Sequence, residues 1–253
     1  MFALLTRMLL TRFTAFLLIV MIACSGKAND ATEASPDTRG KTGKQTDVRG
    51  VKAGRILFLG NSITRHGPAP KIGWTGNWGM AASEEAKDYV HVLVHALAGR
   101  WGESPEFQVH NVAVFERQYD TYDVATILQS HREFQSDIVI VALGENVPAL
   151  ESEDARTRFK GSLRRLLTGL KESGQPVIIV RSCFWPNKAK DEILRQACEA
   201  VGGMFVDISE LGKDESNFAR SEGDFAHAGV AAHPGDKGMK AIADAVLKVL
   251  ADR

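Results

Sequence analysis

The sequence predicts an α/β domain in which helices cover both faces of a five-stranded parallel sheet, a three-layer sandwich of the flavodoxin type. Two observations lead to this prediction. Short apolar, often β-branched runs alternate with longer segments of helical apolar spacing, and this β-α order recurs five times. Parallel strands joined by right-handed helical crossovers have this pattern. Ligands of such sheets bind beyond the carboxyl ends of the strands, so we expect functional residues there.

The five predicted strands are four or five residues long. Runs this short and apolar fit strands that helices cover on both faces. They are residues 56–59, 107–110, 138–142, 177–180 and 204–208.

The segments between these strands are predicted helices. Ser83 is expected to cap the first one, with Glu84 and Glu85 in its first turn, where carboxylates interact favourably with the helix dipole. The third carries several Arg and Lys residues and is expected to be a solvated amphipathic helix. The predicted helices are residues 83–100, 120–132, 151–173, 188–201 and a last one after Asp236.

The N-terminus has the pattern of an export signal. Residues 1–23 contain Arg7 and Arg12, no acidic residue, and an apolar stretch that is shorter than a membrane span. The stretch ends at Cys24 in a way that resembles a bacterial lipoprotein processing site, so Cys24 is a candidate lipidation site. The alternative is simple cleavage after Ala28. Either outcome predicts an exported protein of the periplasm or cell envelope, with membrane attachment only through a lipidated N-terminus.

Residues 24–50 are a predicted flexible tether, and residues 51–253 are the predicted folded domain. The tether has one large aliphatic residue, Val48, and too little apolar surface to offset its ordering entropy. The whole chain has 31 basic and 31 acidic residues, whereas the domain has 24 basic and 27 acidic residues, a net charge of −3. A nucleic-acid partner is therefore not expected, because phosphate binding needs a clustered cationic excess.

No cofactor is expected either. The sequence has neither a Gly-x-Gly-x-x-Gly motif nor a Walker loop. His91 and His95 are four residues apart, but Val92 follows His91 where a His-Glu-x-x-His zinc motif has Glu, so we interpret the pair as part of a helix face. No metal site is predicted.

Three polar motifs follow strands or precede the last helix: residues 60–64, 144–147 and 233–238. Each alone is compatible with an ordinary turn. Together they place Ser62, Asn146 and His233 at the same edge of the predicted sheet. A serine, an amide donor and a histidine can act as nucleophile, oxyanion donor and general base.

In these three motifs, from about Arg55 to the C-terminus, the sequence resembles the SGNH (GDSL-type) hydrolase superfamily, in the branch of exported bacterial esterases. The resemblance implies that Ser62 attacks an ester carbonyl, that His233 takes the Ser62 proton, and that Asn146 and backbone N–H groups hold the oxyanion. Residues 63 and 64 are Ile and Thr, which argues against the Gly-x-Ser-x-Gly elbow of α/β-hydrolases.

The sequence departs from the family pattern at three places. Asn61 replaces the usual Asp before the nucleophile, a change we expect to be minor. Glu116 occupies the position of an oxyanion-hole Gly, so its backbone N–H is the candidate donor there. The acid expected three residues before His233 is Val230, which leaves two alternatives: Asp224 orients His233, or a backbone carbonyl does so in a Ser-His dyad.

Three tryptophans are predicted to bind substrate. Trp74 and Trp78 follow the nucleophile in a long insertion, and Trp185 follows the fourth strand, so all three are expected at the rim of the site as aromatic surfaces for sugar rings. An alternative for Trp74 and Trp78 is a place in the core. A pairing between Cys183 and Cys198 stays open.

These observations predict a serine esterase that cleaves an ester, foremost an acetyl ester, from a carbohydrate or other small substrate through an acyl-Ser62 intermediate. The alternatives are a glycan O-acyltransferase and a non-catalytic glycan-binding protein with an esterase fold. The sequence does not determine the oligomeric state.

Overall fold

A computed structural model of the chain describes residues 47–48, 51–52 and 54–251 and contains the expected five-stranded parallel sheet. The strand order β4-β3-β5-β6-β7 is the flavodoxin-like order, and every neighbouring pair is parallel. The predicted fold class is thus confirmed. The strands are β3 (Arg55–Gly60), β4 (Glu106–Asn111), β5 (Ile138–Val141), β6 (Val177–Arg181) and β7 (Met204–Val206).

The predicted signal segment, Cys24 and most of the predicted tether lie outside the described residues. The two described residues of the tether form β1 (Asp47–Val48), which pairs antiparallel with β2 (Val51–Lys52) in a separate small sheet. No helix in the described part of the chain is long and apolar enough to span a bilayer.

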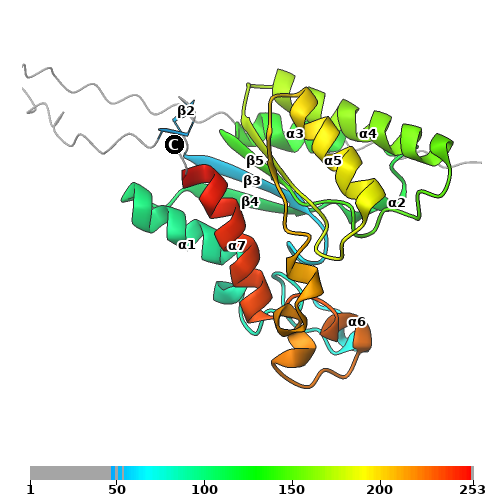
Figure 1. The fold of residues 1–253 in the computed structure, drawn as a ribbon. Helices are drawn as coiled ribbons and strands as arrows, with labels where there is room; N and C mark the ends of the chain where they lie inside the picture. Colours follow the sequence, from blue (N-terminus) through cyan, green and yellow to red (C-terminus); the bar gives the residue numbers. More distant parts are fainter. Residues whose placement is uncertain (1–46, 49–50, 53, 252–253) are drawn as a thin grey trace, which may run out of the picture. The chain divides into compact units, whose positions relative to one another are not determined.

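Helices cover both faces of the sheet, as Figure 1 shows. One face packs against α1 (Tyr89–Trp101) and α7 (Asp236–Ala251), and the other packs against α3 (Ala125–Phe134), α4 (Glu153–Glu172) and α5 (Lys188–Ala200).

Alternate residues of each strand point to opposite faces, because side chains of a strand alternate in direction. In β3, Ile56 and Phe58 join the core under α1 and α7, while Leu57 and Leu59 join the core under α4 and α5. The apolar runs of the sequence therefore supply two cores at once.

Two predicted helices begin later in the structure than the sequence suggested. Asp88, not Ser83, caps α1, because its carboxylate accepts a hydrogen bond from the backbone N–H of His91. Ser83 instead donates to Asp236 at the start of α7. The helix expected from residue 120 begins at Ala125.

Two short helices were not predicted, α2 (Ala113–Arg117) and α6 (Ala228–Ala231), and both lie beside the candidate site. Short 3-10 turns complete the described secondary structure: Pro70–Ile72, Glu85–Lys87, Leu211–Lys213, Glu215–Asn217 and Ala219–Ser221.

Cys183 is a free, buried cysteine at the end of β6, so the pairing with Cys198 is not formed. Burial raises the pKa of the Cys183 thiol well above its ordinary value, which keeps it in the unreactive thiol form.

We therefore expect the Cys183 thiol to resist iodoacetamide in the folded protein and to react completely after denaturation without a reductant. Mass spectrometry of the peptide that carries Cys183 measures both states. A disulfide-linked Cys183–Cys198 peptide in a non-reduced digest would contradict the structure.

Candidate active site

Ser62 and His233 are brought together from opposite ends of the domain. The Ser62 Oγ lies 2.8 Å from the His233 Nε2, across 171 residues of sequence. Ser62 sits in the turn after β3, and His233 lies between α6 and α7. The turn requires Gly60, because a Cβ there would be 1.9 Å from the Oγ1 of Thr64. Ser62, just after the carboxyl end of β3, thus contacts a histidine that comes near the end of the domain's sequence.

A backbone carbonyl orients His233. Its Nδ1 lies 2.7 Å from the carbonyl oxygen of Gly229, in α6. A carbonyl can only accept, so Nδ1 carries the ring proton and Nε2 presents a lone pair to the Ser62 hydroxyl. This is the dyad arrangement, one of the two alternatives that the sequence left open.

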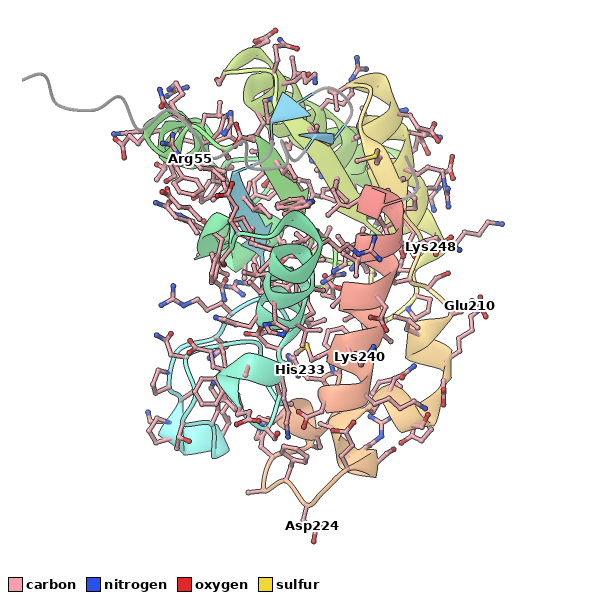
Figure 2. The ribbon with its side chains drawn as sticks, turned by 90° about the vertical axis from the view of Figure 1, so that its left-hand side faces the viewer. Arg55, Glu210, Asp224, His233, Lys240 and Lys248 are labelled. Atoms are coloured by element: carbon pink, nitrogen blue, oxygen red, sulfur yellow. The ribbon has the colours of Figure 1, made fainter. Side chains whose placement is uncertain are left out.

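Asp224 does not reach His233. Figure 2 shows its side chain at the tip of a loop, pointing away from His233, and the structure shows no hydrogen bond between the two. Asp224 is exposed and borders a different hollow. The alternative in which Asp224 orients the imidazole therefore does not fit the structure.

Trp185 supports the imidazole from the side. Its ring meets the His233 ring edge-on at a centroid distance of 5.3 Å, and its Nε1 donates to the Ala232 carbonyl at 3.1 Å. His233 is only 8% exposed. Burial lowers its pKa from the ordinary value of 6.5, because an imidazolium is poorly solvated there. The neutral, proton-accepting form is therefore favoured at neutral pH.

Asn146 follows β5 and is held by Glu116. The Asn146 Nδ2 donates to Glu116 Oε2 at 2.7 Å, and the backbone N–H of Gly144 donates to Glu116 Oε1 at 2.6 Å. An amide nitrogen carries two hydrogens, so one remains for a ligand. The backbone N–H of Ser62 has no hydrogen-bond partner among the described residues. Asn146 and Ser62 therefore supply two donors for an oxyanion.

The backbone and the side chain of Glu116 face different partners. Glu116 lies in α2, and its backbone N–H has no hydrogen-bond partner among the described residues, so it stays a candidate oxyanion donor. Its side chain is fully buried and points to Asn146, and it does not line the pocket. Glu116 is thus a positioning residue that holds the Asn146 amide.

Asn61, the departure that the sequence suggested was minor, joins two buried carboxylates. Its Nδ2 donates to Glu116 Oε1 at 3.1 Å and to Glu145 Oε2 at 2.7 Å. Glu145 Oε1 in turn accepts from Arg181 Nη1 at 2.6 Å. An Asp at position 61 would have no hydrogen to donate and would add a third buried acid.

The pKa values of the two carboxylates move in opposite directions. Burial and the nearby Glu145 raise the pKa of Glu116. Burial alone would also raise the pKa of Glu145, but the Arg181 guanidinium and the hydrogen bonds from Phe184 and Asn61 together outweigh burial and lower that pKa. Sequence reasoning did not identify Glu145 and Arg181 as site residues. The signal that could have revealed Arg181 is a charged residue at the end of an apolar strand, where burial demands a counter-charge.

A pocket of about 310 Å³ opens at Ser62, Asn146 and His233. Ala113 and Arg117 of α2 line one side of it, and His227 lines it next to α6. A larger hollow of about 720 Å³ runs along the edge strand β4, and Asn111 borders both.

None of the three tryptophans lines this pocket. Trp74 is 7% exposed and meets Trp78 edge-on at 5.6 Å. Their indole nitrogens donate to the carbonyls of His66 and Ala82, which fixes the loop after Ser62. Trp185 supports His233, as described above. Trp78, however, lines the larger hollow along β4, so its contact with a sugar stays a prediction for that hollow rather than for the pocket at Ser62.

The described residues hold no cluster of three or more His, Cys, Asp or Glu side chains suited to a metal ion. His91 instead bonds Asp88, with 2.8 Å between Nδ1 and Oδ1.

The fold is similar to solved structures of ester hydrolases. No protein-family model matches the sequence, and no curated protein is significantly similar to it. A putative GDSL-like lipase from Parabacteroides merdae has a TM-score of 0.51 and 16% identity, over 80% of this chain and 98% of that one. A family 3 carbohydrate esterase from Clostridium thermocellum has a TM-score of 0.51 and 16% identity, over 78% of this chain and 94% of that one.

A family two carbohydrate esterase from Cellvibrio japonicus has a TM-score of 0.51 and 15% identity, over 80% of this chain but only 61% of that longer one. The present chain therefore has the fold of the GDSL-like lipases and carbohydrate esterases.

The geometry of His233 predicts its titration. Since burial lowers the pKa, we expect the imidazole to protonate with a midpoint below 6.5 and to carry its proton on Nδ1 above that midpoint. Nitrogen-15 NMR of histidine-labelled protein measures both. The exposed His95 is the internal comparison, and a Nε2–H tautomer for His233 would contradict the assignment.

Proposed function

We propose that the protein is a serine esterase in which Ser62 is the nucleophile and His233 is the general base. The observation that carries this proposal is the 2.8 Å contact between the Ser62 Oγ and an imidazole nitrogen whose lone pair faces the hydroxyl. A base within hydrogen-bond reach of a nucleophile, itself oriented by a third group, is the arrangement that activates serine. The likeness of fold to ester hydrolases supports the same reaction class.

The reaction has two stages. In the first, His233 takes the Ser62 proton while Oγ bonds to the ester carbonyl carbon, and the oxyanion lies between the Ser62 N–H and the Asn146 amide. His233 then gives the proton to the departing alcohol oxygen, which leaves an acyl-Ser62 ester. In the second stage, water loses a proton to His233 and attacks this ester, which releases the carboxylic acid and restores Ser62.

The Gly229 carbonyl performs part of the work of a triad acid. It selects the tautomer and fixes the ring, but as a neutral dipole it stabilises the imidazolium less than a carboxylate does. We therefore expect slower turnover than that of an enzyme with a complete triad.

The substrate we propose is an acetylated carbohydrate. A pocket of about 310 Å³ is at the small end for ligand sites, which favours a short acyl group. The hollow along β4 adjoins it at Asn111 and offers room for the rest of a longer molecule. The named carbohydrate esterases of similar fold agree with this choice. The export signal and lipidation at Cys24 remain part of the proposal, and they would bring the domain to envelope glycans.

In the described part of the chain, the His233 Nδ1 meets a carbonyl and no acid, which favours one second candidate, a glycan-binding protein without turnover. Another carbohydrate esterase of similar fold has an active site with divergent catalytic and non-catalytic binding functions (TM-score 0.50, 10% identity, covering 79% of this chain and 65% of that one). The two candidates differ in whether Ser62 is consumed and restored during turnover.

The purified protein is expected to release p-nitrophenol from p-nitrophenyl acetate, and both Ser62→Ala and His233→Ala should lower kcat by roughly 1000-fold or more, because each removes part of one catalytic unit. Ser104→Ala changes an exposed serine away from the pocket and serves as the matched control. Equal rates for the wild type and Ser62→Ala would reject the esterase, and glycan binding without hydrolysis would favour the second candidate.

Glu116→Gln tests how Asn146 is positioned. The substitution puts an NH2 group where a carboxylate oxygen now accepts a hydrogen bond from the Gly144 N–H or from the Asn146 amide. The Asn146 amide should therefore turn, and kcat should fall by roughly 10- to 100-fold with a smaller change in KM.

Glu103→Gln, at an exposed position, is the control for this substitution. Circular dichroism and thermal unfolding show whether each variant is folded. An unchanged kcat in folded Glu116→Gln would mean that Glu116 does not position the oxyanion donor.

A further inference from the structure

The pocket at Ser62 has a cationic lining with no carboxylate. Among the described residues that line it, Arg117 has the only side chain of permanent charge, and histidines 66, 227 and 233 supply the other ionisable groups. The side chains of Glu116 and Glu145, the two acids that Asn61 joins, are buried and do not line the pocket. A substrate in this pocket therefore meets an unbalanced positive charge.

Arg117 is directed to this pocket by its place in α2. Ala113 and Arg117 are four residues apart and so lie on the same side of the helix, and both line the pocket. The neighbouring Glu116 points inward to Asn146. Consecutive helix residues point in different directions, so one short helix both holds an oxyanion donor and presents a cation to the ligand.

No acid neutralises Arg117 within the described part of the chain. Some other arginines do have acidic partners, such as the exposed Arg220 with Glu215 at 2.6 Å and the half-buried Arg195 with Asp207 at 3.1 Å. Glu116, the acid adjacent in sequence, is fully occupied with Asn61, Gly144 and Asn146. The Arg117 guanidinium is thus available to a ligand.

His227, which caps α6, adds a neutral hydrogen-bond donor to the lining of the pocket. Its Nδ1 accepts a hydrogen bond from the backbone N–H of Gly229 at 3.1 Å, so its ring proton lies on Nε2. The pocket lining consequently offers hydrogen-bond donors from Arg117 and His227, in addition to those for the oxyanion.

We propose that Arg117 selects substrates that carry a carboxylate close to the scissile ester, foremost an acetylated acidic sugar. This inference rests on the proposed esterase function and names its substrate class. The planar guanidinium matches a carboxylate with two parallel hydrogen bonds, whereas a neutral sugar gains no such pairing. The ester itself is neutral, so hydrolysis alone does not require a permanent cation at the pocket wall.

The test compares two substrates that differ only at C6: O-acetylated methyl galacturonoside, which has a carboxylate, and O-acetylated methyl galactoside, which has a hydroxymethyl group. We expect the wild type to prefer the acidic sugar in kcat/KM by about 10- to 100-fold, as a charged hydrogen-bonded pair allows, and we expect salt to weaken the preference. Acetate release measures both rates.

Arg117→Met should abolish this preference, and Arg117→Lys should retain part of it because the charge stays and the fork is lost. Arg100→Met removes an equal charge from an exposed position that lines none of the hollows described above, and it should keep the preference. A second pair, monomethyl succinate and methyl butyrate, places the carboxylate in the acyl part. A preference for monomethyl succinate that depends on Arg117 would support a substrate with a carboxylate. It would also indicate that this carboxylate lies on the acyl group of the ester and not on the alcohol.

Equal wild-type rates within both pairs would overturn the inference. A loss of kcat in Arg117→Met that is the same for charged and neutral substrates would also overturn it, because Arg117 would then serve the oxyanion. Hydrolysis of p-nitrophenyl acetate separates these outcomes from failure of the proposed function: if the wild type does not cleave it or any of the four esters, the esterase proposal itself fails.

Discussion

The arrangement of the site depends on a buried chain of polar groups beneath Ser62. Arg181 binds Glu145, Asn61 bridges Glu145 and Glu116, and Glu116 holds Asn146. Such groups are costly to bury alone and stable only when each has its partners. These buried hydrogen bonds connect the ends of β3, β5 and β6 with α2. The turn that carries Ser62 and the loop that carries Asn146 are therefore fixed by the same contacts.

His233 is positioned by different means. The Gly229 carbonyl and the Trp185 ring fix the imidazole, and the isolated bridge between Phe218 and Pro234 fixes the chain beside it. Ser62 and Asn146 thus lie in turns that follow strands of the sheet, whereas His233 lies in the segment between α6 and α7. Only burial and one neutral dipole act strongly on the histidine, which favours its neutral form but leaves its cation weakly stabilised.

Negative and positive side chains lie at different depths in this site. The carboxylates lie underneath, where Arg181 and amide donors compensate them, and the pocket above presents the Arg117 guanidinium. The place of Glu116 is consistent with this separation, because its carboxylate holds Asn146 without lining the pocket. An Asn at position 61 follows from the same constraint, since a third acid there would have no compensating charge.

The amino-acid sequence by itself determined the β-α alternation, the parallel sheet and the meeting of residues 62, 146 and 233 at one edge, because apolar periodicity and strand ends are local properties. It did not determine which group orients His233, where Glu116 points, or that Trp74 and Trp78 pack on each other. Those outcomes depend on which partners tertiary folding brings within hydrogen-bond and packing distance. Buried polar atoms must find partners wherever the folded chain offers them, and spacing along the sequence does not encode that choice.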